Sequence, residues 1–288
     1  MLYRHVTRSD AQDKMAPWPR LNSTAPLAPW YHRIGWLHIP KCGTSFGTSL
    51  AHLANASLPP DAAMGCLKSG CRFPMGIDFI LRYPYDEWFR GTFWIKRSTV
   101  FANHDSLHAS NGWTPNFDGR IFAMLREPSS RARSAYNHFG KHCHRSFASF
   151  EAKMQGTAVT MITGQRSYGL HCIACGFQCP PLIPDVQLAK QRLNSFAFVG
   201  LTDEWALSVC LLHAMHGPYF HTERCAATEF ANSRKASYRG NEGVLSLNAT
   251  DPYDEELYAE ARRRFLRDVQ RYAVTPQSCR QRGCWPTE

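Results

Sequence analysis

The chain has 288 residues, 44% of them hydrophobic, so it can bury a core as one large α/β domain or as two small ones. Its 33 lysines and arginines outnumber 23 aspartates and glutamates, and the formal charge of +10 favours an anionic partner: a nucleotide, a polyanionic glycan, a nucleic acid or a membrane surface. The sequence predicts neither a membrane anchor nor a signal peptide, because no run of about 18 apolar residues occurs and residues 1–30 carry scattered charges and prolines.

The first 30 residues are polar and rich in proline without periodicity, and we expect a flexible segment ahead of a single domain over residues 31–288. Within the domain, short apolar runs alternate with stretches of helical apolar spacing. This alternation predicts an α/β fold with a mostly parallel central sheet flanked by helices on both faces. The predicted strands occupy residues 33–38, 99–103, 120–126 and 196–200. The predicted helices occupy residues 45–55, 128–139, 205–212 and 251–272.

Two stretches, 59–85 and 143–184, are rich in glycine, proline and cysteine and have no clear period. We interpret them as long surface segments that are pinned by disulfides and shape an acceptor cleft. The 11 cysteines suit an oxidising compartment, and N-glycosylation tripeptides at Asn22, Asn55 and Asn248 agree with this. The Golgi lumen or another secretory compartment is therefore expected, while the lack of a visible leader leaves a cytoplasmic location open.

The segment after the first strand has the features of an anion-binding loop. A tight turn, Lys41-Cys42-Gly43-Thr44-Ser45, leads into a helix whose first N–H groups face outward. Gly43 lets the backbone approach a ligand closely, Lys41 adds a positive charge, and Thr44 and Ser45 add hydroxyl donors. The lysine precedes the glycine, so the loop does not fit the pattern of P-loop kinases and NTPases. A turn that only caps a helix is the alternative.

A second basic motif follows the strand at 120–126. Arg126 stands at the end of this strand, and Pro128 begins the next helix. Ser134 lies eight residues after Arg126, near the second turn of that helix, where it is expected to join the guanidinium on one phosphate.

With these two motifs the chain resembles the sulfotransferases that use 3′-phosphoadenosine-5′-phosphosulfate (PAPS), specifically the Golgi carbohydrate branch that includes heparan sulfate 2-O- and 6-O-sulfotransferases. Residues 38–45 resemble the 5′-phosphosulfate loop of that family, and residues 125–139 resemble its 3′-phosphate segment. Residues 198–205 and the last helix match more loosely. The resemblance implies a P-loop-NTPase-like sulfotransferase fold with PAPS as co-substrate.

The same resemblance assigns the donor-binding residues. Lys41, Cys42, Gly43, Thr44 and Ser45 would hold the 5′-phosphosulfate. Because Cys42 replaces the family's usual threonine, backbone N–H groups and Ser45 must supply more of this binding. The remaining donor-binding residues implied are Arg126 and Ser134 on the 3′-phosphate, and Arg234 and Lys235 in a basic loop over the nucleotide. For the last two, a solvated surface turn is the alternative.

Sulfuryl transfer needs a group that neutralises the leaving oxygen and a base for the acceptor hydroxyl. Lys41 fits the first role. His104 ends the predicted strand 99–103, at the edge where open α/β sheets bind ligands, and it looks like the family's catalytic histidine. His108 and His138 are alternative bases, whereas His38 is expected to pack beneath the loop.

The cysteine-rich segment 171–179 has Cys-x-x-Cys spacing beside a histidine, so a zinc site is an alternative there. Disulfides are the favoured interpretation, and no metal is expected because sulfuryl transfer requires none. The predicted pairs are Cys66–Cys71, Cys210–Cys225 and Cys279–Cys284.

The sequence therefore predicts a PAPS-dependent O-sulfotransferase that acts on a carbohydrate hydroxyl, with a glycosaminoglycan-like acceptor drawn by the positive charge. A sulfotransferase for protein tyrosine or a small molecule would carry the same donor motifs. The alternative from another class is a non-catalytic polyanion-binding protein with the same fold.

Overall fold

A computed structural model of the chain describes residues 35–54, 62–64, 73–75, 106–107, 121–138, 146–165, 182–220, 225–230 and 250–286. Its central element is a parallel sheet of three strands in the order β1-β4-β5. The register places Phe122 of the middle strand opposite Trp36 on one side and Phe198 on the other. The strands are β1 (Gly35–Leu37), β4 (Ile121–Leu125) and β5 (Phe198–Leu201), and a separate parallel pair is formed by β2 (Ala62–Met64) and β3 (Phe73–Met75).

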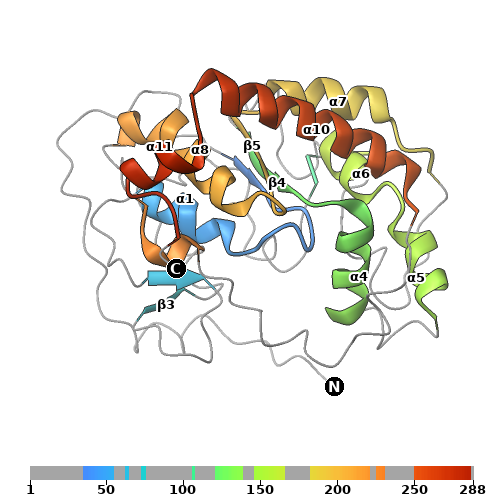
Figure 1. The fold of residues 1–288 in the computed structure, drawn as a ribbon. Helices are drawn as coiled ribbons and strands as arrows, with labels where there is room; N and C mark the ends of the chain where they lie inside the picture. Colours follow the sequence, from blue (N-terminus) through green and yellow to red (C-terminus); the bar gives the residue numbers. More distant parts are fainter. Residues whose placement is uncertain are drawn as a thin grey trace, which may run out of the picture.

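Helices cover both faces of the three-stranded sheet (Figure 1). α1 and α8 lie on one face, and α6, α7 and α10 lie on the other, where α7 and α10 run side by side. The helices in the described residues are α1 (Phe46–Ala54), α4 (Pro128–His138), α5 (Phe147–Met154), α6 (Thr157–Thr163), α7 (Val186–Ser195), α8 (Trp205–Phe220), α10 (Pro252–Arg271) and α11 (Pro276–Gln281), with a short 3-10 turn η5 (Ala227–Phe230).

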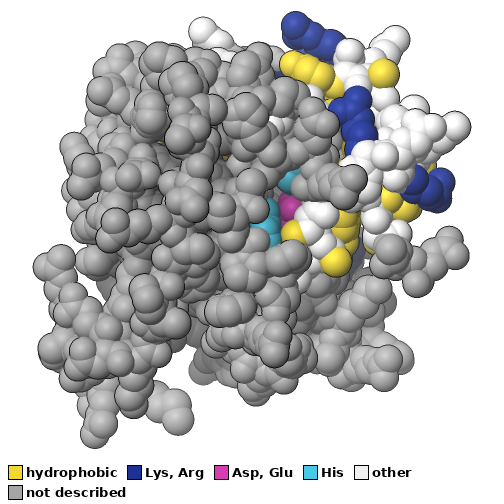
Figure 2. Space-filling model, turned by 90° about the vertical axis from the view of Figure 1, so that its left-hand side faces the viewer, with side chains coloured by type: hydrophobic (Ala, Val, Ile, Leu, Met, Phe, Trp, Pro, Cys, Tyr) yellow, Lys and Arg dark blue, Asp and Glu magenta, His cyan; other side chains and the backbone are white. Residues whose placement is uncertain are grey.

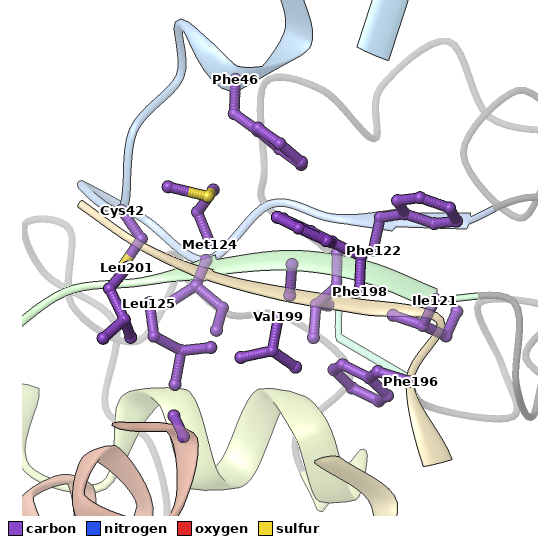
Figure 3. Close-up of a cluster of buried hydrophobic side chains, with 14 of the residues drawn as sticks. Cys42, Phe46, Ile121, Phe122, Met124, Leu125, Phe196, Phe198, Val199 and Leu201 are labelled. Atoms are coloured by element: carbon purple, nitrogen blue, oxygen red, sulfur yellow. The ribbon is translucent and has the colours of Figure 1, made fainter. Parts of the chain in front are cut away.

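Aromatic side chains fill the space between the sheet and α1 (Figure 3). Phe46 stacks on Phe198 with ring centroids 5.5 Å apart, and Phe198 in turn stacks on Phe122 at 6.1 Å. The ring of His216 on α8 lies 4.9 Å from that of Phe122. All three phenylalanines are fully buried, so this face is part of the main hydrophobic core.

The opposite face is covered by α10, whose N-terminus is set by its sequence. Asp251 caps the helix by accepting a hydrogen bond from the amide of Asp254, and Pro252 occupies the first turn. Leu257, Ala261 and Phe265 recur at helical spacing and are buried. This amphipathic pattern predicts the helix from the sequence and orients it against the sheet.

The α/β prediction is confirmed in its coarse form, since a parallel sheet carries helices on both faces. Three of the four predicted strands correspond to β1, β4 and β5, and the four predicted helices correspond to α1, α4, α8 and α10. The strand predicted at 99–103 lies outside the described residues.

The interpretation of 143–184 as an irregular surface segment is wrong for its first half. Residues 147–154 and 157–163 form α5 and α6, and every residue of α6 is buried. A helix that is buried on all sides has no polar face, so the sequence shows no amphipathic period there. Its threonines also favour strands over helices.

The predicted pairs Cys210–Cys225 and Cys279–Cys284 are wrong. Cys210 is joined to Cys279, and Cys225 is joined to Cys284, so both bridges tie the C-terminal segment to α8 and the residues after it. Cysteine spacing along the chain does not determine which partners meet in the fold. The predicted pair Cys66–Cys71 lies outside the described residues. Two disulfides are consistent with an oxidising, secretory environment.

Among the described helices, none has both the length and the apolar character required to cross a lipid bilayer.

Candidate functional site

The loop between β1 and α1 lies at the C-terminal edge of the sheet. It is closed by short-range hydrogen bonds, in which the Cys42 amide donates to the Ile39 carbonyl at 3.1 Å and the Phe46 amide to the Gly43 carbonyl at 3.0 Å. His38 is buried beneath it, stacked on Trp36, with Nε2 3.2 Å from the Thr44 hydroxyl oxygen. The prediction that His38 packs under the loop is confirmed.

Gly43 is required by both backbone and packing. Its φ of +80° is in the left-handed region, and a Cβ added there would lie 2.7 Å from a ring carbon of Trp205. Lys41 also has a positive φ, 65°, which is uncommon for a residue with a side chain. The loop therefore holds a strained conformation against the start of α8.

Arg126 brings the second predicted motif to this loop. It follows β4 directly, and its Nη1 donates a hydrogen bond of 3.5 Å to the Lys41 carbonyl, across 85 positions of sequence. Lys41 and Arg126 are both half-buried. The amide of Thr202, after β5, donates to the Leu125 carbonyl at 2.8 Å. The ends of the three strands thus form one edge that carries two positive charges.

Cys42 faces inward from this loop. Its side chain is 3% exposed and lies over the end of the sheet near Leu201 (Figure 3). Burial raises the pKa of the Cys42 thiol to about 11, although the charges of Arg131 and Arg126 act in the opposite direction. The thiol therefore stays neutral at physiological pH, and any contribution of Cys42 to an anion outside the loop comes from its backbone.

The charge of Arg131 belongs to a buried ionic cluster beneath the loop. Arg131, on α4, is 1% exposed and donates to the carboxylates of Asp254 and Asp251 at the start of α10. Asp254 also accepts 3.0 Å hydrogen bonds from the amides of Ala158 and Val159, at the beginning of α6. The cluster joins α4, α6 and α10 at the same edge of the sheet as the loop.

Carboxylates at this edge have partners of their own. Glu127 accepts hydrogen bonds from the amides of Ser129 and Ser130 at 2.9 and 2.7 Å and so caps α4. Burial raises its pKa, but the hydrogen bonds from Ser130 and Ser129 outweigh this, and the pKa of Glu127 is lowered. Asp203 accepts from the Glu127 amide at 3.3 Å and from the Tyr258 hydroxyl at 2.8 Å. The carboxylates of Glu127 and Asp203, which an anion at this edge would approach, are therefore already hydrogen-bonded within the protein.

Ser134, the other predicted residue of the second motif, is less accessible than Arg126. Ser134 lies on α4 and is 2% exposed, so its hydroxyl is inside the protein. Arg133 was not singled out from the sequence, although it is half-buried on the same helix and donates to the hydroxyls of Ser129 at 2.6 Å and Ser130 at 3.1 Å. Its spacing of four residues from Ser129 is the signal that could have found it.

Several predicted site residues lie outside the described residues. They are His104, His108, Arg234, Lys235 and the cysteine-rich segment 171–179. His138 ends α4. The roles assigned to all of these positions stay predictions.

One group of metal-binding residue types occurs in the described part of the chain. The ligand atoms of His213, Cys225 and Cys284 lie within 4.8 Å of one another. Because Cys225 and Cys284 are joined as a disulfide, their sulfur atoms are not thiolate ligands. His213 instead contacts Glu229, with 2.9 Å between Nε2 and the carboxylate.

No protein-family model matches this chain, and no match was found among curated proteins or solved structures.

Proposed function

We propose that this chain is a PAPS-dependent O-sulfotransferase with a P-loop-NTPase-like fold, acting on a carbohydrate acceptor. The observation that carries the proposal is the 3.5 Å hydrogen bond from Arg126 to the Lys41 carbonyl. This contact joins two motifs that were selected separately in the sequence. Because the ribose of PAPS carries a phosphate at its 3′ position and a phosphosulfate at its 5′ position, two adjacent basic groups at a sheet edge suit it.

In the proposed complex, Lys41 and the amides from Cys42 to Ser45 hold the 5′-phosphosulfate. Arg126 holds the 3′-phosphate, and Ser134 is proposed to join it, although its hydroxyl is buried in α4. Arg234 and Lys235 are proposed to close over the nucleotide. Arg133, which lies on the same helix as Ser134, is a further candidate for the phosphate.

The reaction follows from this placement. The acceptor hydroxyl oxygen forms a bond to the sulfur while the bond from sulfur to the bridging phosphate oxygen breaks, and 3′-phosphoadenosine-5′-phosphate leaves. His104 takes the acceptor proton, and Lys41 neutralises the charge that develops on the bridging oxygen. Because the chain has excess positive charge and its described residues contain two disulfides, the acceptor we favour is an anionic glycan of the secretory pathway, made in the Golgi.

The test is transfer of radiolabelled sulfate from PAPS to a panel of glycans, with calorimetric binding of 3′-phosphoadenosine-5′-phosphate measured alongside. Lys41→Ala and Arg126→Ala should each weaken nucleotide binding by about tenfold or more, because each loses a charge-assisted hydrogen bond. His104→Ala should bind nucleotide normally and lose transfer by about 100-fold or more.

Three results would each contradict a part of this proposal. If the parent protein binds no nucleotide, the proposed donor site is wrong. If His104→Ala retains full transfer, His104 is not the base, and His108 and His138 are the next candidates to test. The proposed donor site is unaffected by this result. Transfer to a tyrosine peptide or a small phenol, but to no glycan, would change the acceptor class alone.

A further inference from the structure

Exposed positive charge in the described residues gathers on the last two helices. From residue 261 to 283 the sequence has seven arginines and a single acidic residue, Asp268. In the rest of the described chain, Lys153 is the one exposed lysine or arginine. The exposed arginines of α10, α11 and the C-cap of α11 are together called the arginine surface: Arg262, Arg263, Arg267, Arg271, Arg280 and Arg282.

The arginine surface has few carboxylates to neutralise it. Glu260 pairs with Arg263 at 2.6 Å and reaches Arg267 at 4.0 Å. Asp268 instead pairs with Arg264, a buried arginine that donates to the carbonyls of residues 193 and 196. Among the described residues, the remaining four arginines of the surface have no carboxylate within ion-pair distance. The face of α10 that points away from the sheet therefore carries net positive charge.

The α11 part of the arginine surface is held in place covalently. Cys279 and Cys284, which flank Arg280 and Arg282, are bonded to Cys210 and Cys225. The guanidinium of Arg280 lies 5.4 Å from the ring centre of Trp285, as expected for a cation–π contact. Figure 2, which views the molecule from the side of α11, shows lysine and arginine side chains spaced over the described surface. Fixed arginines lose less entropy when they bind a ligand.

We propose that the arginine surface docks a linear polysaccharide that bears sulfate or carboxylate groups, and so extends the acceptor site beyond the donor loop. This rests on the proposed sulfotransferase function. The surface begins at Arg262, about one helical turn after Tyr258, whose hydroxyl contacts Asp203 at the edge that carries the loop. A long chain whose reacting sugar sits at that edge can continue along α10.

Guanidinium groups match sulfate and carboxylate oxygens with two parallel hydrogen bonds, so the residue type suits this ligand. The described surface is poorly suited to two other anionic partners, a nucleic acid and a membrane surface. The large hydrophobic side chains exposed on it are Ile183 and Leu266, neither of which is an aromatic platform for nucleic-acid bases. Leu266 alone does not provide the apolar helix face by which a helix enters a membrane surface.

The test uses heparin fragments of defined length, with affinity measured by calorimetry at two salt concentrations and without PAPS. The variant Arg262→Ser/Arg263→Ser/Arg267→Ser should bind about tenfold more weakly and show a shallower salt dependence, because several exposed charge contacts are lost. Arg280→Ser/Arg282→Ser should weaken binding in the same direction. Lys153→Ser, an exposed cation on α5, is the matched control and should stay within about twofold of the parent.

Unchanged heparin affinity in both arginine variants would overturn the proposal. So would duplex DNA or phosphatidylserine vesicles that bind more tightly than heparin and lose affinity in these variants. Sulfate transfer to a short oligosaccharide, which reaches only the donor edge, should be unchanged in the triple variant, while transfer to a long chain should fall. Failure of the proposed function can be distinguished from failure of the docking surface. A parent protein that binds heparin through these arginines but does not bind PAPS would contradict the sulfotransferase proposal and support the docking surface.

Discussion

At the scale of single residues, Gly43 links the fold to the proposed donor site. The substitution Gly43→Ala should destabilise the protein by about 2–4 kcal/mol, because it adds left-handed strain to a clash with Trp205. Since the same loop is proposed to supply the amides that bind the phosphosulfate, nucleotide binding should weaken as well. Urea unfolding and calorimetric titration with 3′-phosphoadenosine-5′-phosphate measure the two effects.

Gly164 provides the matched control. It ends α6 with a φ of +67°, so Gly164→Ala introduces the same kind of backbone strain in a different loop. We expect it to lose about 1 kcal/mol of stability and to keep nucleotide affinity. Equal nucleotide affinity in Gly43→Ala and the parent would mean that the loop does not bind the donor.

At the scale of elements, the buried cluster where α4, α6 and α10 meet should make stability depend on pH. Burial and the neighbouring charge of Asp254 raise the pKa of Asp251 to about 7, although Arg131 opposes this. The folded state thus keeps a proton on Asp251 that the unfolded chain releases near pH 4. The contribution of this group to stability is complete below that pH and is lost as pH rises through about 7.

Replacement of Asp251 by asparagine removes this titration and retains a helix-capping side chain. The free energy of unfolding of the parent relative to Asp251→Asn should therefore fall as pH rises from about 4 to about 7. Asp185→Asn, at the exposed N-cap of α7, controls for the change of capping residue. Chemical denaturation at five or six pH values gives the result, and parallel curves for parent and Asp251→Asn would contradict it.

The elements that were predictable from sequence are those whose pattern is local. The five apolar residues of β4, the capped start of α10 and the turn at Gly43 follow from short windows of sequence. The partners of Arg131 are not of this kind, since Asp251 and Asp254 lie more than 100 positions away. No pattern around Arg131 distinguishes a buried arginine from a solvated one.

The candidate site divides in the same way. Lys41 and Arg126 were predictable because Arg126 directly follows β4, Lys41 lies in the turn after β1, and parallel strands end at one edge. Asp203 and Tyr258 were missed as site residues, because their contact depends on how α10 crosses the sheet. The inward orientation of Cys42 also depends on packing against Leu201 and is invisible in the order of residues.

At the scale of the whole molecule, the two disulfides of the described residues should be partly redundant, so that removal of both costs more than the sum of the two single removals. They join residues 69 and 59 positions apart and run between the same two segments, so each closes a long loop when it is alone. Once one bridge exists, the second closes only a short additional loop. Loop-closure entropy then predicts a loss of about 3 kcal/mol for either single removal and about 7–8 kcal/mol for both.

The variants Cys279→Ser, Cys284→Ser and their combination test this in guanidinium unfolding without reductant. The double variant should also release α11, and with it Arg280 and Arg282, so its heparin affinity should fall further than that of either single variant. Peptide mapping without reduction fixes the pairing independently, since the fold requires cross-linked peptides that contain Cys210 with Cys279 and Cys225 with Cys284. Cross-links within residues 210–225 or 279–284 would instead mean that the C-terminal segment is not tied to α8, and the arginine surface would lose its fixed end.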